Sequence, residues 1–353
     1  MNQLSSAQFV HEMDKSLVRQ IYPGGRTALH LAAEEADENM CQWLLENQIG
    51  ISYLFPSGKG SILHHVAKNK DFGAQLVRFF FNMGLDMNCQ DEKNNTPLML
   101  ALRAGNFTVA QGLLDHGATL DVTIDGMNII HFCIADNNLE GAIFVHSKNQ
   151  MMVQEVCKEG MNALHLAAAN ADLRMCEWLC GESVELCALS GETENSVLHY
   201  AVNNLEHGVG LVDFFVTKGV NVNGRNLYSK TALHLALSKE NINIAEALLS
   251  SGANINVILD HDNVLHYCAR RDKLLSAKFV VGVDKELVRE TTLSGISALH
   301  LAAQAASLDF CKFLVENGAN FLVVNAFNQS VLAMVPRDRK DKKKYFRSLG
   351  LKK

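Results

Sequence analysis

The stretch Lys230-Thr-Ala-Leu-His-Leu-Ala-Leu-Ser-Lys239 decides the fold, because copies of its centre recur along the chain. Copies of Ala-Leu-His-Leu-Ala begin at Ala28, Ala163, Ala232 and Ala298. Looser copies keep the histidine position, which Met99 fills once, and successive positions lie 32 to 35 residues apart. A period near 33 residues is typical of proteins built from stacked repeats.

The clearest repeat predicts two short helices. Thr231 is suited to cap the first helix, because its hydroxyl can accept a bond from a free backbone N–H. The segment 241–250 follows as a second helix, and Gly252 is placed to end it in a left-handed backbone conformation. The small alanines let neighbouring helices approach closely, while leucines fill the space between repeats.

This unit resembles the ankyrin repeat, whose signature is Thr-Pro-Leu-His-x-Ala, then Leu-Leu, then Gly-Ala. A second match is Thr96-Pro-Leu-Met-Leu-Ala101 with Leu113-Leu114 and Gly117-Ala118. The resemblance implies an all-α solenoid of about ten helix-turn-helix units with short β-hairpin turns between them. It also implies a protein-binding rather than a catalytic role.

A longer repeat of 135 residues is superimposed on the short one. Trp43 and Trp178 are 135 residues apart, and the pattern of unit lengths recurs with the same offset. We therefore expect a single array over 1–353, made of the following segments: a half-repeat cap at 1–25, four-unit blocks at 26–160 and 161–295, a further repeat with the start of the last unit at 296–335, and a basic capping segment at 336–353.

The 135-residue register also aligns the first residues of the chain. Ser6–Val10 aligns with Gly141–Val145 and with Ser276–Val280, which belong to predicted second helices. Two interpretations stay open: a half-repeat that caps the array, or a piece of a longer array.

The fourth unit of each block lacks the Gly-Ala ending. Its pattern, Ala277-Lys-Phe-Val280 followed by Val288-Arg-Glu290, resembles units of the rabankyrin family. That family consists of endosomal trafficking scaffolds with a BTB domain and a lipid-binding FYVE zinc finger. This sequence shows neither flanking domain, so the resemblance implies a repeat-only fragment or relative without its own phosphoinositide site.

Eight of the fourteen histidines share one position in the repeat, and we expect them to be structural. In ankyrin repeats this imidazole bridges backbone groups of adjoining turns. Packed helices lie about 10 Å apart, which is too far for neighbouring repeats to share a metal ion. The eight are His30, His64, His131, His165, His199, His234, His266 and His300.

No catalytic or metal-binding pattern stands out elsewhere. The sequence lacks GxxxxGK[ST], HExxH and GxSxG motifs, and its nine cysteines contain no paired CxxC. We expect no enzyme activity, no cofactor and reduced cysteines. No secretory signal and no long apolar run is present, which predicts an intracellular protein. The cytoplasm is the favoured site, with endosome association or the nucleus as alternatives.

Charge is distributed unevenly. The net charge is −6, yet 336–353 carries nine Lys or Arg and two Asp, so the remainder is strongly acidic. An acidic array repels phosphate backbones, so nucleic acid is not an expected partner. The basic segment Arg337–Lys353 could be a capping helix, a targeting signal or a contact for anionic membrane.

We expect other proteins to bind the hairpin tips and the first helices, along the concave face of the stack. Aromatic tips are favoured because aromatic side chains dominate binding energy at interfaces. The candidate tip residues are Phe55, Lys59, Asp91, Glu92, Lys93, Tyr228 and Asp262. The candidate first-helix residues are Glu34, Arg103, Lys239, Arg270 and Arg271. A scaffold or adaptor role is favoured; a regulatory ankyrin protein, such as an inhibitor or a ubiquitin-ligase substrate adaptor, is the alternative.

Overall fold

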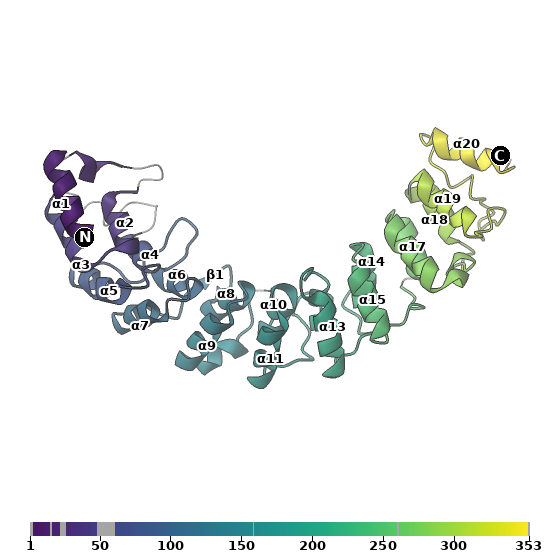
Figure 1. Cartoon of the computed structure of the whole chain (residues 1–353). Helices are drawn as coiled ribbons and strands as arrows, with labels where there is room; N and C mark the ends of the chain where they lie inside the picture. Colours follow the sequence, from purple (N-terminus) through teal and green to yellow (C-terminus); the bar gives the residue numbers. More distant parts are fainter. Residues whose placement is uncertain are drawn as a thin grey trace. The chain divides into compact units, whose positions relative to one another are not determined.

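The structure is a computed structural model that describes residues 3–14, 16–21, 26–47, 61–157, 159–259 and 261–351. It consists almost wholly of short helices joined in antiparallel pairs, as expected for an all-α repeat fold (Figure 1). The chain divides into two compact units, Met1–Lys158 and Glu159–Lys353. None of the helices in the described ranges is long and apolar enough to cross a membrane.

Unit 1 contains nine α-helices, two 3-10 helices and one small hairpin within its described residues. Its elements are α1 Gln3–Met13, η1 Leu17–Arg19, α2 Ala28–Glu35, α3 Glu38–Glu46, α4 Ile62–Val66, α5 Gly73–Asn82, α6 Pro97–Arg103, α7 Phe107–Asp115, β1 Thr123–Ile124, β2 Met127–Asn128, α8 Ile129–Ala135, α9 Leu139–Lys148 and η3 Gln150–Gln154.

Unit 2 continues the alternation of first and second helices. Its elements are α10 Ala163–Asn170, α11 Leu173–Gly181, α12 Val197–Ala201, α13 Gly208–Thr217, α14 Ala232–Ser238, α15 Ile242–Ser250, α16 Val264–Arg270, α17 Leu274–Val283, η4 Lys285–Val288, α18 Ala298–Ala305, α19 Leu308–Glu316 and α20 Lys340–Ser348.

The first helices begin where the sequence predicts, at a polar residue three positions before the recurring histidine. Asn162 shows why: its Oδ1 accepts a bond from the backbone N–H of His165 at 3.0 Å, and the histidine Nδ1 accepts one from Asn162 N at 3.1 Å. This reciprocal pair satisfies two backbone donors that a helix start would otherwise leave free. Thr231 and His234 repeat the arrangement in α14.

The core runs between neighbouring repeats. Within each unit, first helices pack on first helices, as α10 does on α12, and second helices on second helices, as α13 does on α15. Leu233 and Ala236 of α14 are buried, as the repeat pattern predicts. Each repeat therefore buries its apolar surface mainly against the repeat before and the repeat after it.

Buried amides tie the repeats together at the ends of the first helices. Asn69 Nδ2 donates to Ala33 O at 3.1 Å and to Ala36 O at 2.9 Å. Asn204, which is 135 residues further on, makes the same pair of bonds to Ala168 O at 3.2 Å and Ala171 O at 2.8 Å. Both amides satisfy carbonyl groups that have no partner inside their own helix.

The irregular repeats differ from the regular ones in the segments that follow their helices. Residues 67–72 and 202–207 join the two helices of the second repeat in each 135-residue block, whereas residues 104–106 join the two helices of a regular repeat. The longer link arises partly because the first helix ends earlier, at Val66 in α4 against Arg103 in α6. In the fourth repeat of each block, a 3-10 helix follows the second helix: η3 follows α9, and η4 follows α17.

The β structure between repeats is short. β1 and β2 pair antiparallel, with Thr123 opposite Asn128. Single antiparallel bridges join Leu259 to Asp262, Thr291 to Ser297 and Val324 to Ser330.

The basic C-terminal segment contains the packed helix α20. Phe346 is buried, and so is Lys342, although Lys342 belongs to the basic run. Lys342 Nζ donates to Ala302 O at 3.1 Å and Ala303 O at 3.0 Å in α18. One lysine of the basic run therefore caps carbonyl groups of a first helix, as Asn69 and Asn204 do for the first helix of the preceding repeat.

Candidate protein-binding surface

Three of the hairpin tips share one backbone design. At each of these three, a side-chain oxygen accepts bonds from the backbone N–H groups two and four residues later. Asn226 Oδ1 accepts from Tyr228 N and Lys230 N, both at 3.0 Å. Asn325 Oδ1 accepts from Phe327 N at 3.0 Å and Gln329 N at 2.9 Å. These bonds fix the backbone conformation of the tips, so the side chains there extend from a rigid backbone.

Asp91 builds the same turn in unit 1. Its Oδ1 accepts from Lys93 N at 2.8 Å and Asn95 N at 2.9 Å. Burial raises the pKa of Asp91, but the bonds from Asn95 and Lys93 outweigh it, so the pKa is lowered. Asp91 thus supports the tip, whereas the predicted residues Glu92 and Lys93 are exposed on it.

The same tip position carries different side chains in the two units. Lys93 occupies it in unit 1, while Tyr228 and Phe327 occupy it in unit 2. Tyr228 is 59% exposed and Phe327 69% exposed. Sequence reasoning selected Tyr228 and missed Phe327, although the Asn-x-aromatic spacing of Asn325 and Phe327 repeats that of Asn226 and Tyr228. That spacing is the signal that could have found it.

Backbone bonds join adjacent tips of unit 2. Leu227 N donates to Thr193 O at 2.9 Å, and Ala326 N donates to Ser294 O at 2.9 Å. The exposed Leu227 and Leu293 sit on these joined tips, and Leu293 is 89% exposed. Unit 2 therefore presents aromatic and aliphatic side chains along its tips. Lys230 adds a positive charge, with its Nζ 5.9 Å from the centre of the Tyr228 ring.

Other predicted tip residues behave differently. Phe55 and Lys59 lie outside the described residues. Asp262 is buried rather than presented on the surface, because its carboxylate pairs with the guanidinium of Arg270. The two candidate residues Asp262 and Arg270 thus form an ion pair inside one repeat, in which Asp262 is buried and Arg270 is exposed.

Glu34 holds together a cluster of charges between two repeats. Its carboxylate lies 2.8 Å from Arg26 Nη2, 3.1 Å from His65 Nδ1 and 3.5 Å from Lys68 Nζ. Burial raises the pKa of Glu34, but the bond from His65 and the nearby positive charges lower it below the ordinary value overall. Glu34 thus joins α2 to α4 and is only partly available to a partner.

The remaining predicted first-helix residues also have neighbours. Arg103 pairs with Asp136 at 2.7 Å, and both side chains are exposed. Arg271 lies over the buried Tyr267, with its guanidinium carbon 3.9 Å from the ring centre. Lys239 is exposed at the end of α14. Exposed ion pairs contribute little stability, about 0–1 kcal/mol, so Arg103 could exchange Asp136 for a partner at low cost.

The repeat histidines link each first helix to the turn that leads into the next. The Nδ1 atom accepts a backbone N–H, so the proton resides on Nε2, which donates to a carbonyl oxygen. The observed Nε2–O distances are His64–Asn95 2.9 Å, His131–Glu155 3.2 Å, His165–Ala188 3.1 Å, His199–Lys230 2.9 Å, His266–Ile296 3.1 Å and His300–Gln329 3.2 Å.

The remaining two of the eight histidines are His30 and His234. His30 Nδ1 lies 3.1 Å from Thr27 N, as in the other repeats. His234 makes its Nδ1 bonds to Thr231, but its buried Nε2 has no hydrogen-bond partner among the described residues. Burial lowers the pKa of both to about 4, and that of His165 likewise, so these imidazoles are neutral at physiological pH.

Within the described residues, no group of three or more His, Cys, Asp or Glu side chains could hold a metal ion. The cysteines, all of which lie in the described part, form no disulfide. Burial raises the pKa of the Cys176 thiol to about 12, with smaller contributions from neighbouring acidic groups, which leaves it a poor nucleophile.

Comparisons with known proteins agree with the repeat architecture. The family model for three copies of ankyrin repeats matches residues 63–155 and 164–259. The model for a single ankyrin repeat matches residues 24–53 and 294–328. The two models together match well over half of the chain.

Several curated proteins are similar to the chain over part of its length. The nuclear factor NF-kappa-B p105 subunit of Gallus gallus is 31% identical, covering 50% of this chain and 18% of its own length. Alpha-latroinsectotoxin-Lt1a of Latrodectus tredecimguttatus is 29% identical, covering 87% and 22%. Human rabankyrin-5 is 29% identical, covering 40% and 12%.

The chain thus spans less than a quarter of the length of each of these relatives. Paired helices, capped first helices and family-model matches along most of the sequence lead to one assignment. The chain belongs to the ankyrin-repeat family.

Proposed function

We propose that this chain is a non-enzymatic scaffold or adaptor that binds partner proteins through the hairpin tips of unit 2. One observation carries the proposal: Tyr228 and Phe327 are exposed aromatic side chains on tips whose backbone is fixed by Asn226 and Asn325. An aromatic anchor on a rigid base loses little conformational freedom when it binds, so more of its contact energy contributes to affinity.

The other first-helix residues support a secondary role. Arg103, Lys239 and Arg271 remain exposed, whereas Asp262 and Arg270 are largely engaged with each other. Lys230 and Arg225 lie close to Tyr228 in sequence, which favours a partner segment that combines apolar and acidic residues. The mixed charge of the repeat surface suits a protein better than a polyanion.

The setting that we propose is membrane traffic in the cytoplasm or at endosomes. The support is the resemblance in sequence pattern of the fourth repeat of each block to units of rabankyrin, together with the 29% identity of human rabankyrin-5 over 40% of this chain. A regulatory ankyrin protein, similar in role to an inhibitor or a ubiquitin-ligase substrate adaptor, is the alternative.

Affinity capture with mass spectrometry tests the tip surface. The wild-type chain, a Tyr228→Ala/Phe327→Ala variant and a control would be compared as baits. Leu205→Ala suits the control, because Leu205 is 83% exposed on the link between α12 and α13, away from the tips. Proteins retained by the wild type and the control but lost by the double variant would support the proposal. An unchanged set of proteins with the double variant would overturn it.

A second candidate function rests on the basic C-terminal end. A groove of about 310 Å³ there is lined by three cations, Arg337, Lys343 and Arg347, together with Leu332 and Val335. This combination suits an anionic lipid surface, because positive side chains near a negative membrane each contribute about 1 kcal/mol.

Vesicle sedimentation tests this second candidate. The full chain is compared with an Arg337→Gln/Lys343→Gln/Arg347→Gln variant, which keeps the buried Lys342 and Phe346 in place. Binding to phosphatidylserine vesicles that the variant loses would support membrane contact. Equal binding by both proteins would exclude it.

A further inference from the structure

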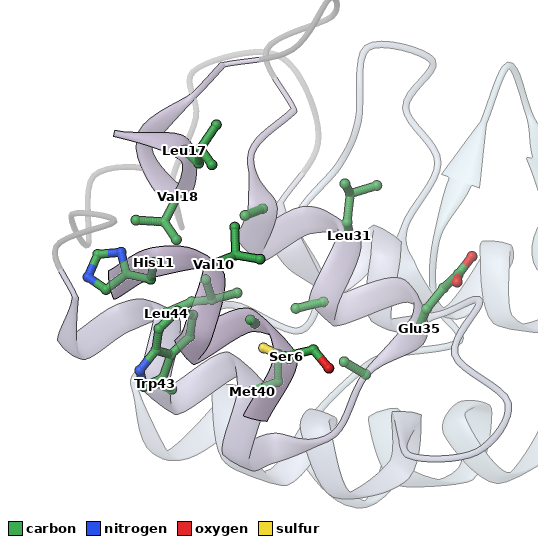
Figure 2. A pocket seen from close by; sticks show the side chains of 14 residues that line it. Ser6, Val10, His11, Leu17, Val18, Leu31, Glu35, Met40, Trp43 and Leu44 are labelled. Carbon is green, nitrogen blue, oxygen red and sulfur yellow. The ribbon is translucent and has the colours of Figure 1, made fainter. Parts of the chain in front are cut away.

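Unit 1 has an open apolar cavity of about 470 Å³ among α1, η1, α2 and α3 (Figure 2). Val10, Leu17 and Leu31 line it, with Met40 and Trp43 on another wall. Figure 2 shows these side chains converging from separate helices on one space. A folded protein seldom leaves such a concave apolar surface uncovered without a ligand or a partner.

The 135-residue register provides counterparts for the lining residues. Val10 is 47% exposed, while its counterparts Val145 and Val280 are 0% exposed. Leu17 is 38% exposed, while Met152 is 2% and Leu287 is 1% exposed. Leu31 is 46% exposed, while Leu301 is 1% exposed. The same positions are thus buried in the other copies of the block and exposed in this one.

The structure also shows what closes the counterparts. In unit 1, α8 packs on α9 and η3. In unit 2, α16 packs on α17 and α18. Since α1 aligns with α9 and α17, and α2 aligns with α18, the cavity occupies the place of a first helix such as α16. Among the described residues, no helix fills that place beside α1 and α2.

The two covering helices share a chemistry. Each begins with two buried aliphatic residues and has a buried cysteine at the fifth position: Ile129, Ile130 and Cys133 in α8, and Val264, Leu265 and Cys268 in α16. Glu35 lies at the rim of the cavity, at the end of α2. Its charge favours a basic residue in the last turn of an incoming helix, which is where α16 carries Arg270.

We propose that this cavity binds a short amphipathic helix of a partner protein, which completes the repeat as α16 does in unit 2. The helix would place two aliphatic residues and a small residue one turn later in the cavity, with a basic residue towards Glu35. This is helix-in-groove recognition. The site is separate from the tip surface and does not depend on the proposed function.

A peptide with the sequence of residues 261–275 and Cys268→Ala is the probe, because it carries the cap, the helix and the basic end of α16. It would be titrated into the full chain carrying Trp178→Phe, so that Trp43, which lines the cavity, reports binding by fluorescence. An intramolecular lactam would hold the peptide helical, since isolated short helices are marginal in water.

We expect saturable binding by this peptide and none by a scrambled one. Val10→Asp and Leu31→Asp should each weaken binding at least about tenfold, because a buried carboxylate lacks a partner there. Leu205→Asp, on an exposed link, should leave binding unchanged, and so should Tyr228→Ala/Phe327→Ala. Circular dichroism of each variant checks folding. Absence of saturable binding, or equal binding by Leu31→Asp, would overturn the proposal.

Two further measurements distinguish a partner helix from other possible occupants of the cavity. A chimera with residues 261–275 in place of residues 1–5 continues the register into Ser6 and should melt at a higher temperature than the native chain. If the chimera is stabilised but the free helical peptide does not bind, the partner-helix proposal is wrong. If sedimentation shows a dimer that Leu31→Asp dissociates, the occupant is a second copy, and the proposal is likewise wrong.

Discussion

His165 Nε2 lies 3.1 Å from the carbonyl oxygen of Ala188, which joins a first helix to the turn leading into the next repeat. Burial lowers the pKa of His165 to about 4, against 6.5 for an ordinary histidine. The unfolded chain therefore binds more protons than the folded chain between about pH 4 and 6.5, so stability falls as the pH falls through that range.

The stability of the chain should thus decrease between about pH 6.5 and pH 4 and be insensitive to this group above pH 6.5. Chemical denaturation at several pH values measures it. His165→Met should be less stable at neutral pH, because it loses the bond to Ala188, but should show a shallower dependence on pH. Met99 shows that a repeat accepts methionine at this position. Equal pH slopes for both proteins would contradict the assignment.

We expect alanine substitutions at two glycines of α13 to have different effects on stability. A Cβ at Gly208 would lie 2.6 Å from Ala201 O and 2.7 Å from Ile244 Cδ1, whereas one at Gly210 would meet nothing within 4 Å. Gly208→Ala should destabilise by about 1–3 kcal/mol through overpacking. Gly210→Ala should be neutral or stabilise by up to about 1 kcal/mol, because alanine favours the helix. Thermal denaturation decides, and a loss of stability with Gly210→Ala would contradict the geometry.

Leucines in the interior and near the end of the array should differ in importance. Leu233 is 1% exposed between neighbouring repeats, and Leu332 is 7% exposed in the last repeat. Leu233→Ala should cost about 2–5 kcal/mol. Leu332→Ala should cost less, since it has a neighbouring repeat on one side only. Urea denaturation monitored by helicity compares them, and equal losses would argue against nearest-neighbour stacking.

Lys342 should matter more than other lysines of the basic segment. Its Nζ donates to Ala302 O and Ala303 O, while Lys344 is exposed. Lys342→Met should destabilise the end of the array by about 1–3 kcal/mol, because the carbonyl groups lose their donor. Lys344→Met should change stability by less than about 0.5 kcal/mol. Limited proteolysis near α20 reads out the difference, and similar cleavage rates would contradict it.

The sequence predicted the repeat architecture well because the repeat is a local pattern. The cap residue, the histidine and the terminal glycine act within one unit, so Thr231, His234 and Gly252 indicate their structure by spacing alone. The candidate site was harder to predict. Asp262 and Arg270 both stood out as exposed charges, yet their mutual pairing depends on how a turn folds back on its helix.

Two other residues, Lys342 and Phe327, also show what could not be predicted from the sequence alone. A basic run predicts exposed charges, and only the position of α20 against α18 shows that Lys342 is buried. Phe327 was detectable by its alignment with Tyr228, but its exposure depends on the tip conformation that Asn325 imposes. Contacts between repeats, which depend on three-dimensional packing, are what the sequence pattern does not specify.

The histidine bonds also have a mechanical consequence. Those of His199, His266 and His300 each connect one repeat of unit 2 to the next. A stretching force along unit 2 would pass through these junctions in series, so the weakest junction would yield first. His234 has no such bond among the described residues. The junction after α14 is therefore where rupture under tension should begin, and single-molecule pulling would show unit 2 separating there.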